Sequence, residues 1–134
     1  MSLTKDRDTK AKEAKRFYAP VAASTTIYKG ALVARDASGN LVPGAVATTL
    51  KKAGVAVESV DNTGSAGAVG CHYETGCFAF GNSTSTDEIT KADIGNDCYI
   101  VDDETVAKTS GTNTRSIAGE IVDVDDYGVW VLFK

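Results

Sequence analysis

The sequence has few aromatic residues, two prolines and a single histidine. Aromatic residues make up 7% of the 134 residues, so a core must be formed mainly by Ala and Val. His72 is the only histidine that could act as a base, and no Ser or Cys stands in a nucleophile motif such as Gly-x-Ser-x-Gly. These absences disfavour an enzyme, and we expect His72 to be a surface or interface residue.

Long hydrophobic runs are also absent. No stretch approaches the roughly 18 to 20 consecutive apolar residues that cross a bilayer, and the first residues lack the apolar core of a secretion signal. We therefore expect no membrane partner. The formal charge of −4 also disfavours nucleic acid as a partner.

Cysteine is scarce, and the three cysteines lack Cys-x-x-Cys spacing. Cys71 and Cys77 would lie about 20 Å apart along an extended strand, beyond disulfide reach unless residues 74–76 form a tight turn. Together with Cys98 they are expected to be buried free thiols. A zinc site would need more ligands than His72 adds, so we expect neither a metal nor another cofactor.

The negative charge is unevenly distributed. Residues 1–16 contain six Lys and Arg against three Asp and Glu, whereas the rest of the chain contains eight against fifteen, so the net charges are +3 and −7. The basic residues of the first segment are Lys5, Arg7, Lys10, Lys12, Lys15 and Arg16. Because this segment has no apolar stripe that could dock on a core, we predict a flexible N-terminal arm over residues 1–16. A basic arm on an acidic body suggests contact with a partner, although a plain disordered terminus has the same composition.

From residue 17 onward the pattern predicts short strands separated by polar turns. Three stretches are expected to form hairpins: residues 30–43, 98–107 and 117–133. Residues 68–80 are expected to continue as one long β segment with bulges or bends at Gly70, Gly76 and Gly81, and residues 61–64 to break the strand before them. These elements predict a single all-β domain over residues 17–134, a small β-barrel or β-sandwich built from hairpins.

A weak internal repeat emerges when the chain is shifted by 65 residues. The matched positions are Gly30 with Gly95, Leu41 with Val106, Ala53-Gly54 with Ala118-Gly119, Val57 with Val122, and Glu58 with Asp123. The repeat predicts two similar β units that close on one core.

Two acidic segments, residues 102–104 and 123–126, admit two interpretations. Carboxylate oxygens are ligands that Ca²⁺ prefers, but neither segment has the spacing of a calcium loop. Asp also begins turns by accepting hydrogen bonds from nearby backbone amides, and we favour this interpretation.

Four aromatic residues also admit two interpretations: Phe78, Phe80, Trp130 and Phe133. On an exposed strand they could form a platform for a sugar, but their Val and Leu neighbours favour packing in the core or at a subunit interface. A core of small residues has limited capacity to stabilise a lone body, so we expect a homo-oligomer.

Five segments occur in an order that is similar to a known family. They are KGALVARDASGNLVPG, AGVAVESVDNTG, AGAVGCHYETGCFAFGN, ADIGNDCYIVDD and SIAGEIVDVDDYGVWVLFK. Over about residues 17–134 the chain resembles the capsid cement, or head decoration, proteins of tailed bacteriophages. The resemblance implies a non-enzymatic β protein, made in the bacterial host cytoplasm and located on the virion capsid surface. It also implies binding as a trimer at junctions of the major capsid protein, which stabilises the expanded head.

The arm lies outside these matched segments, so its role is a separate hypothesis. We expect its six basic residues to order on an acidic stretch of the shell surface, with contacts repeated at many sites. The alternative is a trimeric, β-rich tail-fibre or baseplate module that binds a carbohydrate. An enzyme is the third class, disfavoured because no acid, base and nucleophile set is recognisable.

Overall fold

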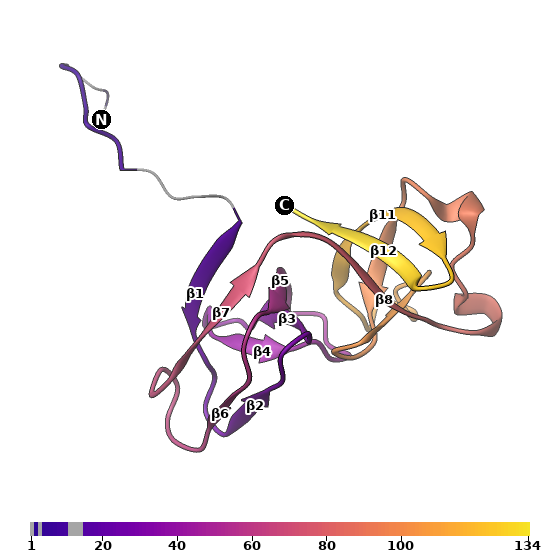
Figure 1. Ribbon diagram of the computed structural model, residues 1–134, viewed down its shortest axis with the longest axis horizontal. Coiled ribbons are helices and arrows are strands. Elements are labelled where there is room, and N and C mark those ends of the chain that lie inside the picture. The colour runs from indigo at the N-terminus through magenta and orange to yellow at the C-terminus, as the bar shows by residue number, and fades with distance from the viewer. Residues whose placement is uncertain (1, 3, 11–14) are drawn as a thin grey trace.

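The computed structural model describes residue 2, residues 4–10 and residues 15–134, and over these residues the chain is all-β (Figure 1). The predicted fold class is therefore confirmed. In chain order the strands are β1 (Arg16–Pro20), β2 (Thr25–Ile27), β3 (Leu32–Arg35), β4 (Leu41–Pro43), β5 (Lys51–Ala56), β6 (Val60–Asn62), β7 (Gly70–Glu74), β8 (Gly76–Asn82), β9 (Asp97–Ile100), β10 (Thr105–Ala107), β11 (Ile117–Asp125) and β12 (Gly128–Phe133). Two short 3₁₀ helices, η1 (Ser85–Asp87) and η2 (Lys91–Asp93), lie between β8 and β9. Within the described ranges no helix is long and apolar enough to span a membrane.

The strands from β8 onward, residues 76–133, form what we call the second unit. Its five strands close into a barrel in the order β10-β8-β12-β11-β9. Neighbouring strands are antiparallel except β10 and β8, which pair in parallel at Val106 and Asn82. Closure gives each barrel strand a neighbour on both sides.

The strands that precede the second unit, residues 16–74, form the first unit, which is an incomplete version of the same barrel. Its main sheet has the order β1-β7-β5-β3-β4. Beyond the end of β1, Val21 makes a single parallel bridge with Leu41 of β4, and Ala22 N donates a 3.1 Å hydrogen bond to Leu41 O. The two edges of the sheet therefore meet at one point instead of along a full ladder.

The internal repeat is confirmed by this strand pairing. Strands β1, β3, β4, β5 and β7 pair with one another in the same order as β8, β9, β10, β11 and β12. Gly30 and Gly95, matched by the shift of 65 residues, both have a positive φ, at +91° and +96°. Leu41 and Val106, also matched and fully buried, make the parallel contact in their respective units. Strands β2 and β6 pair only with each other and have no counterpart in the second unit.

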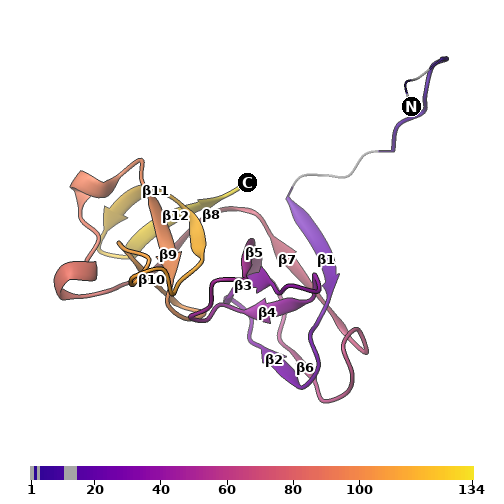
Figure 2. The same ribbon diagram turned by 180° about the vertical axis from the view of Figure 1, so that it is seen from behind.

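The buried apolar residues form two clusters, so the expectation of a single core is wrong. One cluster fills the barrel and the other lies within the first unit. The segment that includes β3 separates them, because Leu32 and Ala34 belong to the barrel cluster whereas Ala31 and Val33 belong to the other. Alternate side chains along a strand point to opposite faces, so one strand serves both cores. Figures 1 and 2 show the two units side by side.

The three predicted hairpins form as β3–β4, β9–β10 and β11–β12. The prediction of one long β segment over residues 68–80 is wrong, since Thr75 separates β7 from β8 and the two strands enter different sheets. Gly76, with a φ of +138°, begins the new strand in a conformation that side chains disfavour.

The predicted break at residues 61–64 begins too early, because Asp61 and Asn62 belong to β6. Asn62 is buried, and its side-chain amide donates to the carbonyl oxygens of Val21, Ala22 and Ser65. These hydrogen bonds satisfy a polar group that burial would otherwise destabilise.

Gly54 and Gly119 are needed because the neighbouring backbone lies very close. A Cβ at Gly54 would collide with Glu74 O, and a Cβ at Gly119 would lie 2.5 Å from Leu132 O. The two collisions occur at positions matched by the repeat, so the same close strand approach is built into both units.

Gly119→Ala is therefore expected to lower the free energy of unfolding by about 2 kcal/mol, a typical cost of overpacking. Gly64→Ala is the matched control, because its added Cβ would meet no atom closer than 3.4 Å and should change stability by about 0.5 kcal/mol or less. Denaturant unfolding of both variants measures the difference. Equal stability of the two variants would show that the backbones are not held this close.

Candidate functional site

The described part of the arm runs away from the body (Figure 1). Its printed contacts are local: Lys10 Nζ lies 3.2 Å from Asp8 Oδ2, and Arg7 donates to the Thr9 hydroxyl. Over residues 4–10 no hydrogen bond or ion pair joins the arm to the rest of the described chain. Lys5, Arg7 and Lys10 are exposed, and Lys12 lies outside the described residues. The described cations therefore remain accessible to a partner.

The last two predicted arm residues are engaged within the chain. Arg16 is the first residue of β1, one residue before the predicted start of the body. Its Nη2 lies 2.7 Å from Glu74 Oε1, and Lys15 Nζ lies 4.0 Å from the other oxygen. Thr75 N also donates a 2.8 Å hydrogen bond to Lys15 O. Lys15 and Arg16 therefore fix the base of the arm to β7.

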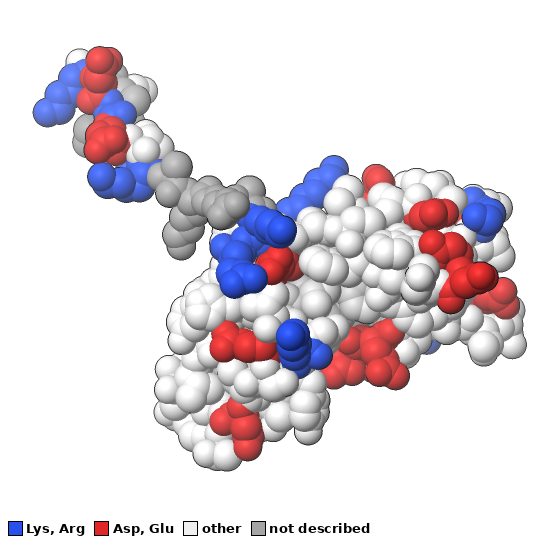
Figure 3. Space-filling view, viewed as in Figure 1, with Lys and Arg blue, Asp and Glu red and all other residues white. Residues whose placement is uncertain are grey.

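Glu74 is the carboxylate that pairs with both cations where the arm joins the body. The hydrogen bond from Arg16, together with the positive charge of Lys15, holds the pKa of Glu74 below its ordinary value. Figure 3 shows the Lys and Arg side chains along the arm and at its base, and Asp and Glu side chains spread over the visible face of the body. The place where the arm joins the body is thus a local cluster of cations on an otherwise acidic body.

His72 lies on the exposed side of β7, as expected for a surface residue. Its Nδ1 is 2.5 Å from Glu58 Oε2, its backbone N donates to the same oxygen, and its ring lies 4.6 Å from that of Tyr18. These hydrogen bonds lower the pKa of Glu58, that from the His72 backbone N–H contributing most. Cys71, the adjacent thiol, is buried on the opposite face, so the two residues form no Cys-His dyad.

The three cysteines are free, and two of them are buried as predicted. Burial raises the pKa of Cys71 to about 11 and that of Cys98 to about 12, which leaves both thiols protonated and unreactive at neutral pH. The prediction is wrong for Cys77, which is exposed on β8.

The four aromatic residues lie on two faces of the barrel wall. Phe80 and Phe133 are buried in the barrel cluster, with ring centroids 5.9 Å apart, and Phe78 packs against them. Trp130 lies on the other face of β12, half-buried, and its Nε1 donates a 2.9 Å hydrogen bond to Asp125 Oδ2. The three phenylalanines therefore belong to the core, as one of the two interpretations predicted.

An apolar row covers the outer face where β8 and β12 pair. Trp130 is opposite Ala79 and Leu132 is opposite Cys77, while the alternate residues point into the barrel. Such a partly exposed apolar row is typical of a contact surface. We call these four residues the outer row.

The acidic turns use their carboxylates to hold the backbone. Asp102 accepts a 2.9 Å hydrogen bond from Glu104 N, and Asp125 accepts one of 2.8 Å from Tyr127 N. These bonds support the predicted turn-forming role. In the part of the chain that the structure describes, no group of three or more His, Cys, Asp or Glu residues is placed to hold a metal.

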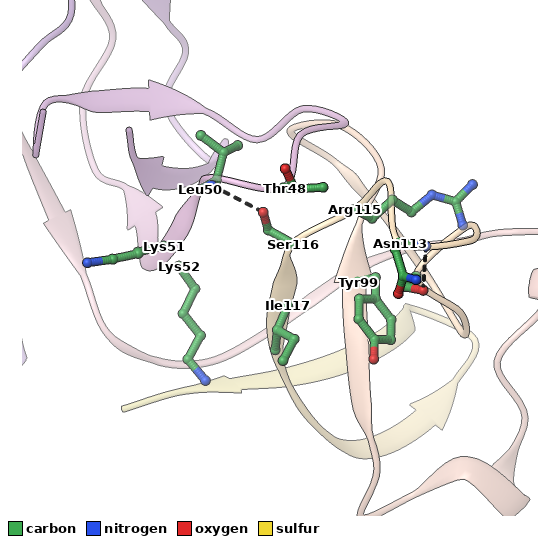
Figure 4. Close-up of a pocket in the computed structure, with 10 residues that line it drawn as sticks. Thr48, Leu50, Lys51, Lys52, Tyr99, Asn113, Arg115, Ser116 and Ile117 are labelled. Carbon is green, nitrogen blue, oxygen red and sulfur yellow. Dashed lines mark hydrogen bonds between the residues drawn. The ribbon is translucent and has the colours of Figure 1, made fainter. Parts of the chain in front are cut away.

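A pocket of about 720 Å³ lies between the two units, and the sequence did not predict it (Figure 4). Its lining includes Thr48, Lys51 and Lys52 from the first unit and Tyr99, Asn113 and Ile117 from the second. We call it the junction pocket. The sequence does not reveal this pocket, because residues 48–52 and residues 110–117 are far apart in the chain and meet only in the fold.

Comparison with protein-family models, with curated proteins and with solved structures finds no match to this chain.

Removal of the charge at the base of the arm tests how firmly β1 is held. In Glu74→Gln the ion pairs with Arg16 and Lys15 are lost, so we expect amide protection in β1 to fall about two- to fivefold. Glu104→Gln is the control, since Glu104 is an exposed carboxylate that forms no ion pair among the described residues. Hydrogen exchange measures both variants.

The pH dependence of β1 protection follows from the same pair. Because the pKa of Glu74 is lowered in the folded state, its stabilisation is present above the ordinary Glu pKa and is lost as the pH falls through the lowered value. The protection of the parent protein should then approach that of Glu74→Gln. Protection factors that stay apart at low pH would contradict a role for this ion pair.

Proposed function

We propose that this chain is a head decoration, or cement, protein of a tailed bacteriophage. It binds the outer surface of the assembled capsid, as a trimer at junctions of the major capsid protein, and stabilises the head. The observation that carries the proposal is the arm, a charged segment that extends away from the body and is fixed at its base by Arg16 and Glu74. The order of segments that resembles such proteins supports the same function.

The arm suits attachment to a large surface. Its described cations, Lys5, Arg7 and Lys10, are free of contacts with the body and can reach an acidic part of the shell. Ordering such a segment costs conformational entropy, which charge and backbone contacts must offset. A trimer carries three arms, and contacts shared among them raise the overall affinity above that of one arm.

The surface of the body is compatible with many copies bound to the outside of one particle. Its net charge of −7 over residues 17–134 limits adhesion to DNA and to other acidic particles. The outer row on β8 and β12 supplies apolar surface for contact between copies, with Trp130 and Leu132 as its largest members. A small-residue body gains stability when copies bury such surface together.

The described side chains favour binding over catalysis. His72 is held by Glu58, and the thiols of Cys71 and Cys98 have raised pKa values. Neither arrangement supplies an activated nucleophile beside a base, which acyl or phosphoryl transfer requires. We therefore propose a non-enzymatic role.

Binding to expanded heads of its own phage, prepared without the decoration protein, tests the proposal. The full chain should co-sediment with these heads at near-physiological salt. Removal of residues 1–14 should weaken binding by about tenfold or more, because four cations are lost, while Lys15 and Arg16 keep β1 in place. The circular dichroism spectrum and melting temperature of the truncated body should match those of the full chain.

A pair of double variants separates the arm from overall charge. Lys5→Gln with Arg7→Gln removes two charges from the arm, and Lys29→Gln with Lys134→Gln removes two from the body. Only the arm variant should bind heads more weakly, and its loss should shrink as salt is raised. Absence of co-sedimentation by the full chain would refute the proposed function, whereas equal binding by both variants would refute the role of the arm.

A further inference from the structure

The junction pocket differs from other hollows of the surface in its charge. The hollow beside Lys29 also contains Asp103 and Glu104, and the one beside Lys91 contains Asp125 and Asp126. A third, beside Arg16, contains Glu58. None of the residues that line the junction pocket is acidic. Among these described hollows it is therefore the one whose lining combines cations with no carboxylate.

Two of those cations are available to a ligand. Lys51 and Lys52 are exposed at the start of β5 and form no ion pair or hydrogen bond through their side chains within the described chain. Arg115 is different, because its Nη1 lies 3.3 Å from Asp87 and donates to Thr109 O. In Figure 4 Lys52 extends on the same side as Tyr99 and Ile117, whereas Lys51 points away from them. Lys52 is thus the cation best placed over the pocket.

The pocket also has an apolar floor. Tyr99 of β9 and Ile117 of β11 are direct partners in the barrel, and their side chains lie side by side on its outer surface (Figure 4). Ile117 is 42% exposed, so its aliphatic side chain is accessible to a ligand. An aromatic ring with a hydroxyl beside an aliphatic group is suited to a ligand with one apolar face and a polar rim.

The walls of the pocket are held in place before any ligand binds. Ser116 Oγ donates a 2.6 Å hydrogen bond to Ala47 O and accepts one of 3.2 Å from Leu50 N, which ties the first unit to the second. On the opposite wall Asn113 N donates to Ser110 Oγ at 3.0 Å. A preformed site loses less conformational entropy on binding.

These features point to one class of ligand. We propose that the junction pocket binds a sugar that carries a carboxylate, with the sugar ring against Tyr99 and Ile117 and the carboxylate against Lys52. The hydroxyl groups of the sugar would meet the side chains of Asn113 and Thr48 at the rim. The volume of about 720 Å³ lies within the range of about 300–1,000 Å³ that small-molecule sites occupy.

The pairing of the floor strands favours a sugar over an acidic peptide. One common way for an extended peptide to bind is to add a strand to an open sheet edge. Strands β9 and β11 have neighbours on both sides in the closed barrel, so the floor has no open edge. Sugar binding goes beyond the proposed attachment to a shell and does not depend on it, since neither the described part of the arm nor the outer row lines the pocket.

Titration of the full chain with tri-galacturonate, followed by ¹⁵N–¹H NMR, tests the proposal. The amide signals of Tyr99, Asn113 and Ile117 should shift, and the neutral galactose trisaccharide should shift them much less. Lys52→Gln should raise the dissociation constant for tri-galacturonate about three- to tenfold, because it removes the charge that meets the carboxylate. Lys29→Gln is the matched control, with the same change of charge in a hollow that already contains carboxylates.

Three outcomes would overturn the proposal. Equal weakening by Lys52→Gln and Lys29→Gln would indicate attraction to overall charge alone, and shifts confined to other residues would place the sugar elsewhere. A Glu-rich peptide that shifts the same signals at lower concentration would make a protein segment the ligand. Unchanged melting temperatures of both variants establish that the fold is intact. Because the titration uses no capsids, its failure leaves the test of head binding separate.

Discussion

The burial of the β3 segment on both faces is the constraint on which the rest of the structure depends. All four residues from Ala31 to Ala34 are buried, and their side chains alternate between the two cores. A segment in this position must be apolar at every residue, as strands in fully covered sheets are. Leu32 N also donates a 2.8 Å hydrogen bond to Asp103 O, so the turn between β9 and β10 is fixed to the same segment. The closed barrel and the incomplete one thus pack their cores against the two faces of one segment.

The parts of the fold that could be predicted from the sequence follow from local patterns. The hairpins were predictable because alternating apolar residues flank short turns rich in Asp, Asn and Gly. The repeat was visible because Gly30, Gly54 and their partners at Gly95 and Gly119 meet backbone requirements that recur in each unit. Turn residues and glycines meet requirements of the backbone around them, so a short stretch of sequence is enough to predict them.

What could not be predicted depends on contacts between distant segments. The apolar pattern over residues 68–80 does not show that its two halves enter different sheets, since both halves alternate in the same way. The division into two cores rests on which face of β3 meets which unit, and that is decided by tertiary packing. The arm was recognisable from its charge. Its predicted last residue, Arg16, nevertheless belongs to β1, where it forms an ion pair with Glu74, 58 residues away. The junction pocket was invisible for the same reason, as its walls come from separate parts of the chain.

The proposed role of the chain on a phage head is tested most directly by a cryo-electron microscopy reconstruction of expanded heads saturated with the full chain. We expect the body as a threefold cluster on the outer surface, with density for the arm that runs from β1 along the shell. Bare heads, or bodies whose arms point into solvent without touching the shell, would contradict the proposal.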